Sequence, residues 1–235
     1  MSAKVGRTEF RLRGLEMTRL ETFTDAAFAF AITMLVLRQN IPATVPELLD
    51  ALKGIPAFLG SLANLMLFWS VHRRFSRRYG LEDTKTIFLT ISLIAVMLIY
   101  VYPLKFMFSV AFAFMIPALR TQEFSRNQLV DTSLGDMFLV YGVGFVAFQF
   151  IFWLLFRHAN GLRTQMELNE SEVYDTRTDM GMALLQMVVG LTSVVLATAL
   201  RNEGVWVVLA GWAYSLLSIL MPWYAIRREK KRPVL

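Results

Sequence analysis

The chain has 235 residues, of which 56% are hydrophobic and 13% aromatic, and its formal net charge is +6. This apolar fraction is too large for a soluble domain of this length, so the composition indicates a membrane protein. Cysteine is absent from the sequence, which excludes disulfides and thiolate chemistry.

Apolar residues arrive in six blocks, which predict membrane-spanning helices in chain order. The blocks are 21–37, 56–72, 84–104, 137–156, 180–200 and 205–225. Each is near the ~20 residues that cross a hydrocarbon core about 30 Å thick, although the first is long enough only with its polar first turn. Such segments must be helical, because a helix satisfies its backbone hydrogen bonds internally. The sequence thus predicts an all-α, polytopic membrane protein with six transmembrane helices.

The distribution of the 24 Lys and Arg residues predicts the topology. Five precede the first block, five lie between the second and third or at the start of the third, three lie between the fourth and fifth, and five follow the sixth, against six elsewhere. Basic residues concentrate in cytoplasmic loops, so we expect both termini to be cytoplasmic. Nucleic-acid binding is the alternative interpretation of a basic chain. Here the basic residues are distributed according to the apolar blocks, so we interpret the positive charge mainly as a sign of membrane topology.

The segments between the blocks indicate one domain over residues 1–235. Residues 106–116 are apolar again, and they either continue the third helix beyond a kink near Pro103 or pack on the bundle outside the membrane. We expect the longest outer loop at 117–136, and a solvated linker or helix extension at the acidic inner segment 157–179. The basic N-terminus is interpreted as leading into a retained helix, not a cleaved signal peptide.

Motifs of common enzyme classes are absent from the sequence. It has no His-Glu-x-x-His zinc motif, no Gly-x-Ser-x-Gly nucleophile elbow and no Walker-type glycine-rich loop. An intramembrane aspartyl protease needs two facing carboxylates, and only Asp25 and Asp179 are expected near the same membrane surface, without flanks typical of a catalytic pair. We therefore expect no enzymatic activity, no cofactor and no metal beyond permeating ions.

The first block carries Asp25 at the start of an unbroken apolar run. A carboxylate at the centre of a membrane helix costs about 2.5–3.5 kcal/mol, and less near an end. Successive residues of a helix are rotated by about 100°. Asp25 therefore points roughly a quarter-turn away from a stripe of residues on the same helix, which has Met34 at its edge. That stripe consists of Thr22, Ala26, Phe30, Thr33 and Leu37. In an arbitrary membrane helix, these would be ordinary packing side chains, and Asp25 with Arg19 a structural ion pair.

Two motifs resemble those of a known family. Residues 19–25 read Arg-x-x-x-Phe-Thr-Asp and are followed by Ala-x-Phe-Ala-x-Ala-Ile-Thr, similar to the first helix of the transmembrane protein 175 family. That family comprises potassium-permeable channels of lysosomes and many prokaryotes, with the signature Arg-x-x-x-Phe-Ser-Asp. Residues 69–73, Trp-Ser-Val-His-Arg, resemble the Trp-x-x-His that closes its second helix.

The resemblance implies a homotetramer in which four copies of the first helix, about 19–38, line a central pore constricted by apolar side chains. The pore-facing residues that it implies are Phe30, Thr33, Met34 and Leu37. The structural network that it implies consists of Arg19, Phe23, Thr24, Asp25, Trp69 and His72.

Two features of the sequence depart from the family pattern, one in the first helix and one in the third. The family has isoleucine or leucine at the position of Phe30, and often leucine at the position of Met34. Its third helix contributes an asparagine, whereas this chain has none between residues 64 and 127, so we expect Thr90 or Ser92 to substitute.

We expect a multi-pass, homotetrameric, potassium-permeable channel in the plasma or inner membrane of a prokaryote. Its partners would be potassium ions, the lipid bilayer and further copies of itself, and no nucleic acid. The alternative is a non-conducting membrane scaffold, in which an Arg19–Asp25 network only stabilises the fold. A secondary transporter would be expected to show inverted repeats and broken helices, for which the sequence gives no sign.

Overall fold

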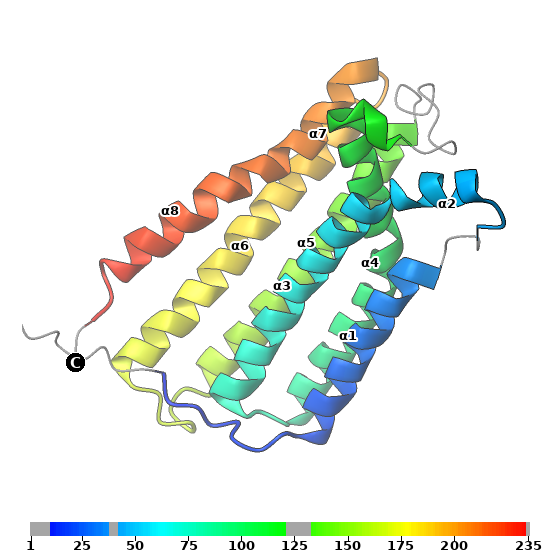
Figure 1. The fold of residues 1–235 in the computed structure, drawn as a ribbon. Helices are drawn as coiled ribbons and strands as arrows, with labels where there is room; N and C mark the ends of the chain where they lie inside the picture. Colours follow the sequence, from blue (N-terminus) through cyan, green and yellow to red (C-terminus); the bar gives the residue numbers. More distant parts are fainter. Residues whose placement is uncertain (1–9, 38–41, 121–132, 234–235) are drawn as a thin grey trace, which may run out of the picture.

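The computed structural model describes residues 10–37, 42–120 and 133–233, and these ranges contain helices and no β-strand. The long helices run side by side along one bundle (Figure 1). They are α1 (Arg19–Leu37), α3 (Ile55–Tyr79), α4 (Thr84–Met115), α5 (Ser133–Gly161) and α6 (Glu170–Ala199). A last helical stretch comprises η3 (Gly204–Val207), α7 (Val208–Trp212), η4 (Ala213–Leu216) and α8 (Leu217–Glu229).

Five helical segments of the described chain are long and apolar enough to cross a membrane. These are Ile55–Tyr79, Thr84–Met115, Leu134–Gly161, Glu170–Ala199 and Val208–Glu229. They confirm an all-helical chain with several membrane-capable helices. α1 has 19 residues, close to the ~20 that span a bilayer, so a sixth span there stays a prediction.

The third predicted helix is longer than its apolar block. α4 is one helix of 32 residues with Pro103 inside it. Of the two alternatives for residues 106–116, the structure therefore has the continuation of the third helix, up to Met115. At 1.5 Å per residue, α4 is about 48 Å long and exceeds the hydrocarbon core of a bilayer.

Two inter-helix segments differ from expectation. α2 (Val45–Leu52), which the apolar pattern does not predict, begins after the N-cap Thr44 and buries none of its residues. It extends away from the bundle beyond the end of α1 (Figure 1). The expected outer loop 117–136 begins with η1 (Pro117–Leu119), whereas residues 121–132 lie outside the described part of the chain.

The acidic inner segment is mostly helical, because α5 continues to Gly161 and α6 begins at Glu170. Asn169 and Glu172 form a capping box at the start of α6, in which each side chain bonds the other's backbone N–H. Glu172 and Asp179 are buried. A solvated linker is thus the wrong interpretation at these two positions, since each carboxylate has a cationic partner within the protein.

Aromatic side chains fill the centre of the bundle. Phe68 of α3 stacks on Phe148 of α5 with ring centroids 4.4 Å apart, and Tyr100 of α4 packs against both rings. α5 and α6 pack closely at glycine, since a Cβ at Gly142 would lie 2.6 Å from a methyl group of Val194. Small residues permit such close helix approach in membranes.

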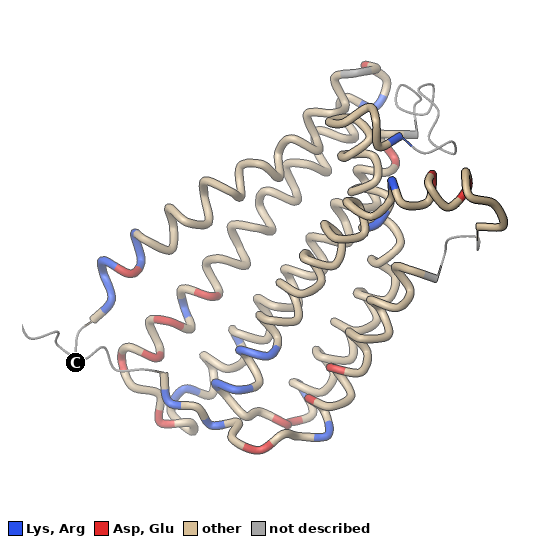
Figure 2. The backbone as a smooth tube through the Cα atoms, in the orientation of Figure 1, with Lys and Arg blue, Asp and Glu red and all other residues tan. Residues whose placement is uncertain are grey.

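Basic residues gather at one end of the bundle (Figure 2). At that end, Arg73, Arg157 and Arg227 each stack on a tryptophan four residues earlier in α3, α5 and α8. We call the end that carries these three arginines the basic end, and the opposite one the far end. The first and last described residues both lie at the basic end (Figure 1).

Candidate functional site

α1 has one buried and one exposed face. Its buried side chains recur every three or four residues and are Glu21, Thr24, Phe28, Ala31 and Leu35. The opposite face is open, so that Phe28 is 1% exposed and Phe30 is 56% exposed. Among the residues implied for a pore, Thr33 is also exposed and Met34 is half-buried. The side chain of Leu37 lies outside the described part of the chain.

The hydroxyls of α1 bond within their own helix. Thr33 Oγ1 donates to the carbonyl oxygen of Ala29 at 3.0 Å on the exposed face, and the buried Thr24 Oγ1 donates to that of Leu20 at 2.7 Å. A hydroxyl has one proton and two lone pairs. The Thr33 oxygen can therefore still accept a hydrogen bond or coordinate a cation from outside the helix.

Asp25 faces α3 instead of the exposed stripe. Trp69 Nε1 of α3 donates to Asp25 Oδ1 at 2.7 Å. The guanidinium of Arg73 lies over the same indole ring, 5.4 Å from its centroid. Trp69 thus joins a carboxylate at its edge to a cation at its face, and a charge-assisted hydrogen bond of this kind is stronger than a neutral one.

His72 lies on the same face of α3, one turn from Trp69. It is buried, and its Nε2 is 3.4 Å from Oγ1 of the buried Thr90 of α4. Thr90 therefore stands where a third-helix partner is expected. The other candidate, Ser92, instead donates to the carbonyl oxygen of Phe88 at 2.8 Å within α4.

Two members of the expected network remain at the surface of the single chain. Arg19 and Phe23 are both exposed, and within the described residues Arg19 forms no ion pair with Asp25. The structure thus brings Asp25 to Trp69 and His72 to Thr90, but it does not bring Arg19 to the carboxylate.

Lys105 of α4 is a further contact of α1. Its Nζ donates to the carbonyl oxygen of Leu35, in the last turn of α1. The last four carbonyls of a helix lack partners within it, and a cation there also complements the helix dipole. The sequence contains a signal for this contact, a lone lysine near the end of the third apolar block, but does not identify its partner.

The segment before α1, residues 10–18, is held by an ion pair that the sequence analysis did not find. Arg13 Nη2 is 2.8 Å from Glu172 Oε2 of α6, and these side chains are only 14% and 3% exposed. Arg13 Nε also donates to the carbonyl oxygen of Met166, and the backbone N–H of Arg11 donates to Glu172 Oε1. The carboxylate oxygens of Glu172 therefore accept their hydrogen bonds from the N-terminal segment and from the N-cap of α6.

The same segment also packs on the end of α3. The backbone N–H groups of Arg13 and Gly14 donate to the carbonyl oxygen of Arg77 at 3.2 and 3.1 Å. A Cβ at Gly14 would lie 2.4 Å from the carbonyl oxygen of Ser76, so only glycine fits this approach. The segment 10–18, which leads into α1, is therefore fixed to both α3 and α6.

The second acidic residue considered for catalysis is engaged elsewhere. Asp179 Oδ2 accepts a hydrogen bond from Arg78 at 2.7 Å, and Arg74 lies 3.8 Å from its other oxygen. Asp25 and Asp179 thus have separate partners. Across the described ranges, no three His, Asp or Glu side chains are grouped so that they could hold a metal ion.

Comparisons with known proteins agree with the motifs. A family model described as the endosomal/lysosomal potassium channel TMEM175 matches residues 19–103. A protein of Marivirga tractuosa named "Potassium channel" is 32% identical over 232 residues, which cover 96% of this chain and 94% of that protein. A protein of Chamaesiphon minutus, also named a potassium channel, is 37% identical over 67 residues, 25% of this chain and 33% of that protein.

A solved structure shares the fold. The crystal structure of a variant of the potassium channel MtTMEM175, in complex with a nanobody–MBP fusion protein, matches with a TM-score of 0.81. The two chains are 29% identical, and the match covers 96% of this chain and 99% of the other.

Proposed function

This chain belongs to the TMEM175 family, and we propose that it is a potassium-permeable cation channel whose pore is lined by α1. The similar protein of Marivirga tractuosa is named a potassium channel, and the proposal extends that activity to this chain. The observation that carries it is the exposed face of α1, which presents Ala26, Phe30 and Thr33 away from the core.

In this proposal four copies of the chain form the pore, because one helix face cannot enclose an ion path alone. Cyclic symmetry sets the same face of each copy around a common axis. The four Phe30 rings form the constriction, with Met34 and Leu37 as further apolar layers. Hydrophobic constrictions gate by dewetting, and phenylalanine is larger than the leucine or isoleucine implied by the family, so we expect a narrow pore.

Thr33 supplies the polar layer next to this constriction. Its proton is directed to the carbonyl oxygen of Ala29, which leaves oxygen lone pairs to replace part of the hydration shell of a potassium ion. A ring of four such oxygens is a weak binding site, and weak sites permit conduction because the ion can leave.

Asp25 has a structural role in this mechanism. Its hydrogen bond to Trp69 turns the carboxylate toward α3, while Lys105 and the segment 10–18 hold the two ends of α1. We propose that Arg19 and Phe23 join this network through contacts between copies, since both are exposed in one chain.

The proposed topology has six spans, with both termini on the cytoplasmic side of a prokaryotic plasma or inner membrane. Three features support it: the described termini lie at one end of the bundle, basic residues gather there, and three tryptophans stack under arginines at that end. Tryptophan marks membrane interfaces, and Lys and Arg mark the cytoplasmic side.

Potassium flux from proteoliposomes that contain the purified protein tests the proposal, with sodium and caesium as comparison ions. We expect potassium to move down its gradient in a preparation that is tetrameric in detergent. A monomer would contradict the four-copy pore. Folded tetramers that pass no ion would favour the alternative, a non-conducting membrane scaffold.

A further inference from the structure

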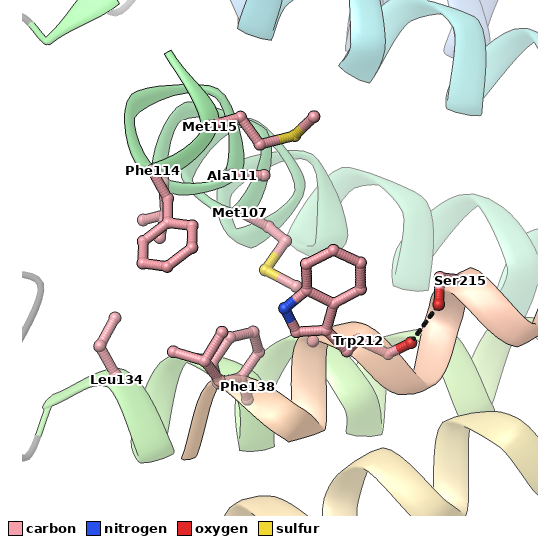
Figure 3. Close-up of a pocket in the computed structure, with 11 residues that line it drawn as sticks. Met107, Ala111, Phe114, Met115, Leu134, Phe138, Trp212 and Ser215 are labelled. Atoms are coloured by element: carbon pink, nitrogen blue, oxygen red, sulfur yellow. Dashed lines mark hydrogen bonds between the residues drawn. The ribbon is translucent and has the colours of Figure 1, made fainter. Parts of the chain in front are cut away.

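A groove of about 220 Å³ lies at the far end of the bundle, between α4, α5 and the α7–η4 stretch (Figure 3). The side chains that form it include Met107 and Phe114 from α4, Phe138 from α5 and Trp212 from α7. In Figure 3 these side chains converge from three separate elements on one space. The groove is distinct from the exposed face of α1 and has no part in the proposed pore.

The lining is apolar, and its one hydroxyl is already engaged. Ser215 Oγ donates to the carbonyl oxygen of Trp212 at 2.7 Å (Figure 3). A buried water needs two to four polar partners, and besides this hydroxyl the side chains of the groove offer only the indole N–H of Trp212. An apolar group is therefore the occupant that fits.

The walls of the groove are built by close packing. A Cβ at Gly211 of α7 would lie 2.7 Å from a ring carbon of Phe138, so glycine is what lets α7 lie directly on α5. Ala111 of α4 leaves the space open on the third side, because it is the smallest side chain of that wall. The groove is thus a defined feature between fixed helices.

The rim of the groove is apolar and exposed. The groove residues Phe114, Met115 and Trp212 are all exposed, and large exposed apolar patches mark protein or membrane contacts. In a multi-pass membrane protein, the apolar molecules available at such a rim are the acyl chains of the bilayer.

The side chain of Arg120 lies at the same end of α4 as the groove. Arg120 Nε donates to the carbonyl oxygen of Ala113 at 3.0 Å, and the next residue in the chain, Phe114, lines the groove. The backbone oxygen of Arg120 accepts from Lys53 Nζ at 3.4 Å, so both ends of the arginine are held. Within the described residues Arg120 has no acidic partner, and its terminal nitrogens are suited to a phosphate group.

We propose that the groove binds one acyl chain of a glycerophospholipid whose phosphodiester is held by Arg120. The apolar walls are suited to an acyl chain. The Arg120 guanidinium, which is held in place but has no acidic partner in the ranges that the structure describes, is suited to the phosphate of the headgroup. Arginine–phosphate contacts are charge-assisted and often bidentate, which distinguishes this lipid from the general annulus around the protein.

Native mass spectrometry of the purified full-length protein tests the site, with dioleoylphosphatidylglycerol as probe and dioleoylglycerol, which lacks the phosphate, for comparison. We expect one phospholipid per chain, bound more tightly than dioleoylglycerol. Ala111→Trp fills the groove and is expected to lower the phospholipid-bound fraction at least about tenfold. Ala95→Trp, at an exposed position of α4 outside the groove, is the matched control and is expected to bind as the unsubstituted chain does.

Arg120→Gln distinguishes recognition of the lipid headgroup from binding of the acyl chain. We expect it to weaken phospholipid binding roughly tenfold and to leave dioleoylglycerol binding unchanged, whereas Lys85→Gln at the other end of α4 has no effect. Equal lipid retention by Ala111→Trp and Ala95→Trp would overturn the proposal, as would equal affinity for the two lipids. Loss of the tetramer in Ala111→Trp alone, with no lipid on the unsubstituted protein, would assign the groove to a second copy of the chain. None of these readouts depends on ion conduction.

Discussion

Trp69 Nε1 donates a 2.7 Å hydrogen bond to Asp25 Oδ1, and this contact fixes the rotation of α1 against α3. With Asp25 held on the α3 side, Phe30 and Thr33 are left on the open face. The carboxylate that first draws attention in the sequence thus orients the helix. The apolar face beside it is the surface that we assign to the ion path.

Trp69→Phe tests the orienting bond. It removes the donor and leaves a half-buried carboxylate without its partner, so we expect a loss of about 1–3 kcal/mol in stability, measured as a lower melting temperature in detergent. Trp153→Phe is the matched control, because Trp153 Nε1 has no hydrogen-bond partner within the described residues. Equal shifts in the two variants would mean that ring packing, and not the hydrogen bond to Asp25, gives Trp69 its effect.

Arg13→Gln breaks the buried ion pair with Glu172. Removing one partner of a buried pair strands the other charge, so we expect a loss of about 3–5 kcal/mol, measured by unfolding in detergent. Arg11→Gln is the control, because the Arg11–Glu167 pair is 3.9 Å long and its side chains are 60% and 83% exposed. Such exposed pairs contribute about 0–1 kcal/mol, and a comparable loss in both variants would contradict the assigned role of Arg13.

Asp83 gives the protein an acid-sensitive contact at the start of α4. Partial burial raises the pKa of its carboxyl, but hydrogen bonds from Thr86 and His158 outweigh burial and lower the pKa below its ordinary value. A carboxyl whose folded pKa is lowered stabilises the fold above its unfolded pKa, about 3.9, and this stability is lost as pH falls through the folded pKa.

Asp83→Asn, which keeps an N-cap residue, is therefore expected to lower the melting temperature at pH 7, with the difference from the unsubstituted protein shrinking below about pH 4. Glu82→Gln controls for the loss of one negative charge at the neighbouring residue. A difference between Asp83→Asn and the unsubstituted protein that stays constant from pH 7 to pH 3 would show that the titration of Asp83 does not matter.

Phe30→Ala is expected to raise potassium conductance and to weaken selectivity over sodium, because it widens the proposed constriction. Single-channel recording in bilayers measures both quantities. Phe150→Ala on the exposed surface of α5 removes an equal volume away from α1 and is expected to change neither. Currents of Phe30→Ala that match those of the unsubstituted protein would remove Phe30 from the pore.

Hydropathy predicted the long helices because a run of apolar residues long enough to cross the membrane can be recognised from that run alone, without knowing its neighbours. Residue spacing likewise predicted that Asp25 turns away from the stripe of Phe30, and the hydroxyl of Thr90 was a named candidate for the missing asparagine. In each case the signal lies within one helix, or in a side chain whose chemistry allows few partners.

Polar pairs between residues far apart in the chain could not be predicted from the sequence. Arg13 and Glu172 are 159 residues apart, and a surplus of arginines near the basic end gives no reason to choose this pair. For the same reason, the sequence did not indicate that Asp179 is buried. The first-helix motif suggested an Arg19–Asp25 pair, which does not form among the residues that the structure describes. The sequence did not predict α2, because this helix has only eight residues and buries none of them, so it does not form a long apolar block.

The proposal that the exposed face of α1 lines the ion path is tested most directly by thiol accessibility. Because the sequence has no cysteine, Thr33→Cys introduces one thiol per chain. Thr192→Cys on α6 is its matched control, since Thr192 is also exposed and donates to the carbonyl oxygen four residues earlier. We predict that Cd²⁺, which thiolates bind strongly, blocks potassium current through Thr33→Cys and leaves Thr192→Cys unaffected. Unblocked current in Thr33→Cys, with the thiol shown to be reactive, would contradict the account.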